Sequence, residues 1–242
     1  MGAHLVPCSI LLALFSFARA SVAAQPAPPV GEQTPALRDV FPHVRVDVKN
    51  RIVEFDARVP TVMDDPDMAP AFLEVIACIP DTKEHETLVV TEARPSHVHA
   101  ALLMLGLAPG KPGSWEWVEQ KLVPHQPAGD RVRVDFIYTD QEGLQHIDPA
   151  NLWVKHDGTN EPLQGGEWIF AGSRMLDHGF GEMYNADGVG TLIGLATFGS
   201  ETLAWPTTFS PDSETDEPVW VADPTHVPPV GTPVVVRLTP VR

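Results

Sequence analysis

Short apolar runs separated by turn residues follow one another along most of this chain, and they limit its fold more than any other feature. In the clearest run, Val132, Val134 and Phe136 stand at alternate positions between polar residues. A period of two places one face of a β-strand in the core and the other in water. Similar runs lie at residues 44–48, 53–59, 73–79, 87–91, 168–171, 191–198 and 234–238. The pattern predicts a sheet-dominated fold of mostly antiparallel strands, joined in places by hairpin turns.

One segment, residues 97–105, is predicted as a helix. Its sequence HVHAALLML is rich in helix-forming residues, Ser96 is a suitable N-cap, and Gly106 is a suitable stop. Apolar side chains lie on nearly every side of this helix, so we expect it to be buried in the core. One buried helix among eight or more strands predicts the α+β class.

The first 24 residues are typical of a secretory signal peptide. An apolar run from Leu5 to Phe17 is followed by small residues before Ser21 and before Gln25, which are two possible cleavage sites. The run is too short for a transmembrane helix, which needs about 20 apolar residues. We therefore expect an exported protein, periplasmic or secreted, without a membrane span.

The rest of the chain is predicted to form a tether and one domain. Residues 25–40 are rich in proline and poor in aromatic residues, as in a linker. Residues 41–242 carry the strand pattern, interrupted by a proline-rich and acidic stretch at 205–233 that is predicted as a surface loop. Cleavage of the signal peptide would leave Cys78 as the only cysteine, in an apolar run where a free cysteine is usually a small core residue.

The charge of the chain excludes two classes of partner. Lys and Arg total 16 against 32 Asp and Glu, which gives a formal net charge of -16. Such a surface repels phosphate backbones and anionic lipids. We therefore expect neither nucleic acid nor a membrane surface to be a partner.

Several segments together resemble the YdjY-type domain, a bacterial family common in planctomycetes. They are residues 83–86, 94–110, 168–173 and 184–188, so the resemblance spans roughly residues 44–200. It implies export and no established activity. Some members are described as ferredoxin-like, but an iron–sulfur cluster is normally held by four cysteine thiolates, and this chain would retain one after cleavage.

The candidate metal site consists of His85, Glu86 and His99, with His97 as a substitute ligand. His99 lies near the start of the predicted helix, where the positive end of the helix dipole keeps an imidazole neutral. His85 and Glu86 precede the strand that leads to this helix. If the two ends of that passage meet, the three side chains suit zinc or another divalent ion.

A structural interpretation of the same residues stays open. His97 and His99 diverge by about 200° on a helix, so they do not form a shared ligand pair. Glu84 or Glu86 would then simply accept a hydrogen bond from a histidine at the helix entry.

Two hypotheses about function follow from the sequence. The first is a non-catalytic exported domain that binds an envelope protein or a small ligand, and we favour it because no catalytic motif is recognisable. The second is a metal-binding protein or metal-dependent enzyme centred on His85, Glu86 and His99. Trp115 and Trp117 are a further candidate surface, for stacking on sugar rings, although tryptophans are more often core or loop anchors.

Overall fold

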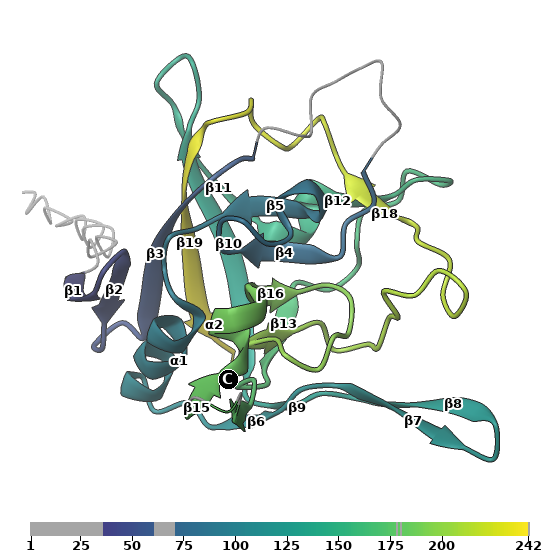
Figure 1. Ribbon diagram of the computed structural model, residues 1–242. Helices are drawn as coiled ribbons and strands as arrows, with labels where there is room; N and C mark the ends of the chain where they lie inside the picture. The colour runs from purple at the N-terminus through teal and green to yellow at the C-terminus, as the bar shows by residue number, and fades with distance from the viewer. Residues whose placement is uncertain (1–35, 61–70, 178, 180, 242) are drawn as a thin grey trace, which may run out of the picture. The chain divides into compact units, whose positions relative to one another are not determined.

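Eight strands close into a barrel in the part of the chain that the computed structural model describes, residues 36–60, 71–177, 179 and 181–241 (Figure 1). Their order around the ring is β3 (Ile52–Arg58), β19 (Pro233–Pro240), β10 (Arg131–Thr139), β13 (Glu167–Phe170), β17 (Leu203–Ala204), β16 (Thr191–Gly194), β4 (Val75–Cys78) and β5 (Thr87–Val90). The ring closes where Arg58 of β3 pairs with Val90 of β5. Neighbours are antiparallel except for the parallel pairs β16–β17 and β4–β5.

The predicted α+β class is therefore wrong, because the sheet closes on itself and the helices do not form a layer against it. The described helices are α1 (Pro95–Met104), α2 (Asn185–Val189) and the short 3-10 turns η1 (Glu84–Glu86) and η2 (Ala150–Trp153). Alternation in a sequence reports the two faces of a strand but not its partners. The closing contact between β3 and β5 was therefore invisible to that pattern.

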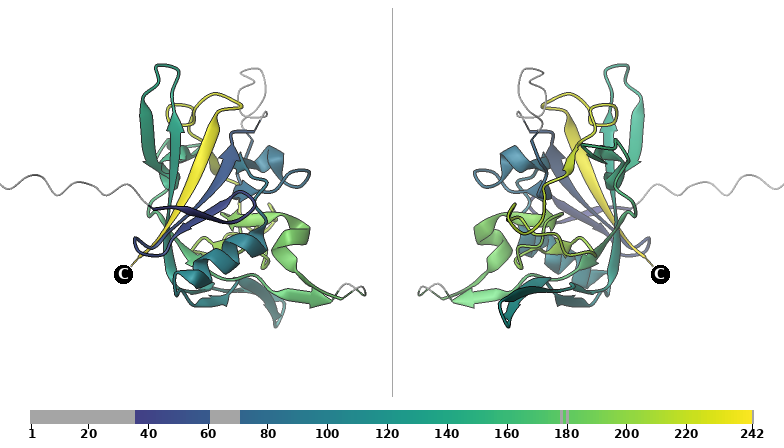
Figure 2. Two further views of the ribbon diagram at one scale, coloured as in Figure 1. Left: turned by 90° about the vertical axis from the view of Figure 1, so that its left-hand side faces the viewer. Right: turned by 90° about the vertical axis from the view of Figure 1, so that its right-hand side faces the viewer.

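The longest pairings lie around β19. This strand runs between β3 and β10, as the yellow strand in the left view of Figure 2 shows. Strands β1 (Arg38–Phe41) and β2 (Val44–Asp47) extend the sheet beyond β3, and β11 (Gln145–Pro149) pairs with β10. The remaining strands form small two-stranded sheets: β6 (Pro109–Lys111) with β9 (Ala128–Gly129), β7 (Ser114–Val118) with β8 (Lys121–His125), β12 (Val154–His156) with β18 (Trp220–Ala222), and β14 (Met175–Asp177) with β15 (Glu182–Tyr184).

Large side chains pack the core. Phe55, Phe136, Trp168 and Phe170 come from three barrel strands, β3, β10 and β13, and all are fully buried in one hydrophobic cluster. Close packing of this kind is typical of small barrels, whose interior is filled by side chains. A ligand of this protein is therefore to be sought on the outside of the barrel.

Parts of the predicted domain organisation can be compared with the structure. The predicted signal peptide, residues 1–24, lies outside the described residues. Strand β1 begins at Arg38, so the end of the predicted tether (25–40) is strand. The stretch 205–233 contains β18, which pairs with β12. Of the helices in the described ranges, none is long and apolar enough to cross a membrane.

Helix α1 covers the predicted segment, but its N-terminus is held differently from the prediction. The first helical residue is Pro95, whose fixed φ suits that position, so Ser96 lies inside the first turn and is not the N-cap. The carboxylate of Asp187 in α2 accepts hydrogen bonds from Ser96 N (2.8 Å) and Ser96 Oγ (2.6 Å). A side chain distant in the sequence thus takes the part of an N-cap.

We expect Asp187→Ala to lower the free energy of unfolding by about 1–2 kcal/mol, because an orphan N–H of α1 loses its acceptor. Ser96→Ala removes one of the two hydrogen bonds and is expected to cost about 0.5–1 kcal/mol. Urea denaturation of both variants measures the difference. An equal or larger loss for Ser96→Ala would show that Asp187 does not cap the helix.

Candidate functional site

The predicted metal ligands His85, His97 and His99 contact different parts of the structure. His85 lies on η1 with 65% of its side chain exposed, and its Nε2 is 3.3 Å from Glu86 Oε1. His99 lies on α1, where its Nδ1 is 2.9 Å from the Tyr184 hydroxyl and its ring edge packs on Phe170. His97 stacks on Phe41 with ring centroids 4.7 Å apart. Among the described residues, the observed contacts join His85 to Glu86 but join neither of them to His99.

No group of three or more His, Cys, Asp or Glu side chains in the described ranges is arranged to hold a metal ion. A lysine that the sequence reading overlooked contacts the carboxylates near His85. Lys83 Nζ is 3.0 Å from Glu74 Oε2 and 3.7 Å from Glu86 Oε2. Zinc binding by His85, Glu86 and His99 stays a prediction, and metal analysis of protein purified without a tag tests it.

Glu74, His85 and Glu86 border a small pocket of about 290 Å³ with apolar walls that include Phe72 and Phe209. Burial raises the pKa of Glu74, and its hydrogen bond with Glu86 raises it further. Lys83 opposes this shift and keeps the pair together. Within this cluster, the carboxylates of Glu74 and Glu86 are thus paired with the ammonium group of Lys83.

His99 belongs to a second cluster that connects α1 with β15. The Tyr184 hydroxyl contacts both His99 Nδ1 and, at 3.0 Å, Thr202 Oγ1. Burial lowers the pKa of His99 and raises that of Tyr184, so both side chains are neutral at pH 7. The chain of contacts fixes the position of α1 against the barrel.

The lowered pKa of His99 predicts a pH effect on stability. The unfolded chain binds a proton at this imidazole more readily than the folded chain does, so His99 lowers stability as the pH falls below its ordinary pKa of about 6.5. We expect wild type to lose stability as the pH falls from 7 to 5, and His99→Gln to lack this loss. The free energy of unfolding of the variant, relative to that of wild type, should therefore rise over this range. Parallel urea curves across this range provide the measurement, and a constant difference would contradict the assignment.

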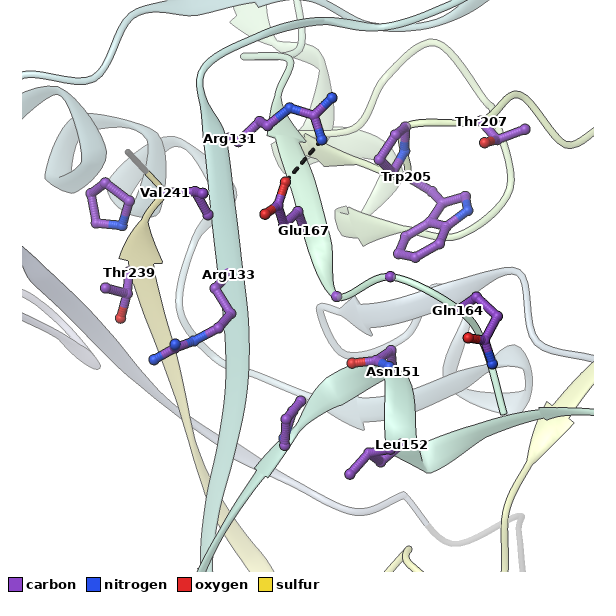
Figure 3. Close-up of a pocket in the computed structure, with 15 residues that line it drawn as sticks. Arg131, Arg133, Asn151, Leu152, Gln164, Glu167, Trp205, Thr207, Thr239 and Val241 are labelled. Carbon is purple, nitrogen blue, oxygen red and sulfur yellow. Dashed lines mark hydrogen bonds and ion pairs between the residues drawn. The ribbon is translucent and has the colours of Figure 1, made fainter. Parts of the chain in front are cut away.

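A larger groove of about 760 Å³ lies on the outer face of the barrel, and Figure 3 shows its walls. It is built from five separate segments: the start of β10, the η2 turn, the loop before β13, the segment after β17 and the end of β19. We call it the Trp205 groove. Its lining is Arg131, Arg133, Pro149, Asn151, Leu152, Gln164, Gly165, Gly166, Glu167, Trp205, Pro206, Thr207, Thr239, Pro240 and Val241.

Trp205 forms the aromatic wall of the groove. Its ring meets the buried Trp168 edge to face, with centroids 4.9 Å apart, and remains half-buried. Gly165 has φ +112°, and a Cβ there would come within 3.2 Å of the Trp205 ring. Gly166 has φ +141°, and a Cβ there would lie 2.9 Å from Asn151 Oδ1. The two glycines therefore allow backbone to pass close to the groove's ring and amide.

The polar side of the groove comes from β10 and β13. Arg131 Nη1 is 2.9 Å from Glu167 Oε2, and Arg133 Nε is 2.8 Å from the buried carboxylate of Asp135. Both arginine side chains are 56% exposed. Their charges are thus held in position by carboxylates and still reach solvent.

The groove could not be predicted from the sequence, because its residues are spread over five segments and match no motif. The alternation at the start of β10 was the available hint. It places Arg131 and Arg133 on the exposed face of the strand, opposite to the buried Val132 and Val134. Of the tryptophans, the reading singled out Trp115 and Trp117, and the structure leaves 73% of Trp117 exposed on the β7–β8 hairpin.

Comparison with known proteins identifies the family. No curated protein and no solved structure matches the chain. The YdjY domain model matches residues 44–239, which include the barrel except for Pro240, the last residue of β19, and the groove except for Pro240 and Val241. The chain therefore belongs to the YdjY domain family, as the resemblance in its sequence implied.

Proposed function

We propose that this protein is an exported, non-catalytic binding protein that holds a small polar ligand in the Trp205 groove. The observation that carries the proposal is the groove itself, which joins an aromatic wall to several hydrogen-bonding side chains. Concave sites with an apolar wall and a few placed polar groups are the usual form of ligand sites. The packed core supports a site on the outside of the barrel.

The chemistry of the lining supports binding without catalysis. Its polar side chains are those of Arg131, Arg133, Asn151, Gln164, Glu167, Thr207 and Thr239. Among these described lining residues, the pairs typical of nucleophilic catalysis, such as a serine or cysteine with a histidine, do not occur. The groups present are suited to orienting a ligand.

Filling the groove tests this function. Thr207 is exposed in the lining, so Thr207→Trp places a bulky ring in the groove without altering the core. Ser213→Trp is the matched control, because Ser213 is exposed and lies outside the lining. Saturation-transfer NMR is measured with glucose, N-acetylglucosamine, galacturonate, cellohexaose, hexagalacturonate, glutamate and lysine as probes.

We expect at least one probe to receive saturation from the wild-type protein and the Ser213→Trp variant and to lose most of it with Thr207→Trp. The same saturation in both variants, or no saturation of any probe by wild type, would overturn the proposed function.

Export has its own expected result. When the full chain is produced in a bacterium, the processed protein is expected outside the cytoplasm with Ser21 or Gln25 as its first residue. N-terminal sequencing of the fractionated protein determines this. Intact Met1 on the protein would contradict export by signal-peptide cleavage.

A further inference from the structure

We propose that the ligand of the Trp205 groove is an acidic saccharide, a short chain of sugar rings that carry carboxylates. The proposal rests on the proposed function and names the ligand class of the same site. It stands on three features of the groove: its charge, its aromatic wall and the position of its strands within the barrel.

The groove does not share the excess negative charge of the chain. Its lining carries two arginines and one glutamate, and Asp135 pairs with Arg133 beside the lining, so positive and negative charges balance there, whereas the whole chain has a formal net charge of -16. Arg131 is engaged by Glu167, but Arg133 uses only Nε, toward Asp135. Within the described structure, the two terminal nitrogens of Arg133 have no partner. A guanidinium edge of this kind binds a carboxylate through two parallel hydrogen bonds.

The arrangement of the groove suits an elongated ligand with alternating apolar and polar parts. Figure 3 shows Arg133 directed toward Thr239 at one side and Trp205 with Gln164 at the other, with Arg131 and Glu167 between them. The flat ring of Trp205 can pack on the C–H face of a sugar ring. Side-chain amides and hydroxyls along the wall are suited to sugar hydroxyls.

The topology argues against an acidic peptide that adds to the sheet. Strand β10 is paired on both sides, with β19 and with β13, where it lines the groove. Its backbone is therefore not an open edge for an extended peptide. Recognition must come from side chains, which favours a ligand read through carboxylates, ring faces and hydroxyls.

Calorimetric titration of the whole protein tests the ligand class with three probes of equal length. Hexagalacturonate is the acidic saccharide, maltohexaose the neutral saccharide and hexaglutamate the acidic peptide. The variants are Arg133→Gln and Arg131→Gln, with Arg38→Gln as the control, because Arg38 is exposed on β1 and outside the lining. All three variants remove one positive charge from an exposed side chain, so the net charge of the protein changes equally.

We expect hexagalacturonate to bind about tenfold or more tightly than maltohexaose, since a charge-assisted hydrogen bond contributes about that factor. It is expected to bind more tightly than hexaglutamate as well, because the peptide has no sugar ring to pack on Trp205. Arg133→Gln is expected to weaken its binding by about tenfold, and Arg131→Gln by a smaller factor, because Glu167 already engages Arg131. The control is expected to bind like wild type, and added salt to weaken binding.

The other outcomes separate the ligand class from the function. Equal binding of maltohexaose, or equal effects of Arg133→Gln and Arg38→Gln, would overturn the acidic class while the groove remains a binding site. Binding of hexaglutamate more tightly than hexagalacturonate would overturn the proposal that the ligand is a saccharide. If none of the three binds and other probes still respond to Thr207→Trp, the ligand class fails and the proposed function stands.

Discussion

Replacing Trp168 by alanine is expected to lower the free energy of unfolding by about 3–5 kcal/mol. The ring is fully buried, its Nε1 donates to Gly194 O at 3.2 Å, and it supports the ring of Trp205. The variant leaves a large cavity and an unsatisfied carbonyl in the barrel wall. It also removes the support behind the groove, so ligand binding is expected to weaken along with stability.

Trp117→Ala is the matched control for this prediction. Trp117 is 73% exposed on the β7–β8 hairpin, so its loss is expected to change stability by less than about 0.5 kcal/mol. Urea denaturation of the two variants gives the comparison. Similar losses would mean that the barrel interior is not packed around Trp168.

Leu102→Ala is expected to cost about 2–5 kcal/mol, because this side chain is fully buried where α1 meets the core. The neighbouring Leu103 is 46% exposed, so Leu103→Ala is expected to change stability by no more than about 0.5 kcal/mol. Both substitutions replace leucine by alanine at neighbouring positions of the helix, so the change in helix propensity is the same for both. Denaturant midpoints test the pair, and a larger loss at Leu103 would mean that the buried face of α1 is wrongly assigned.

Local patterns predicted the elements better than their assembly. Alternation located β10, and the residues before Gly106 do form a helix, which ends where φ of that glycine turns positive. The helix was expected to be buried on all sides, yet Leu103 and Met104 are exposed. A helix on the outside of a barrel can bury only one side, so some of its apolar residues stay in contact with water.

The missed features all depend on residues far apart in the sequence. The pairing of Arg58 with Val90 closes the barrel, and Asp187 takes the capping role assigned to Ser96. Neither contact leaves a periodic pattern, because each joins one residue to a distant one. The metal prediction rested on closeness along the sequence, and the observed contacts of His99 are with Tyr184 and Phe170, so zinc binding stays a prediction.

The groove was the hardest feature to predict. Trp205 follows β17, and Gln164, Gly165 and Gly166 precede β13, so they meet only because those strands are neighbours in the ring. The fold thus brings single residues of common types together in one groove. Such a site becomes predictable only once the order of the strands is known.

The most direct test of the central claim, that ligand binds in the Trp205 groove outside the barrel, is an NMR titration of the indole N–H signals. The chain has six tryptophans, each with one such signal. With hexagalacturonate as the probe, the Trp205 signal is expected to shift, while those of the buried Trp153 and the exposed Trp117 stay in place. A shift of Trp117 or Trp153 with Trp205 unchanged would contradict the claim.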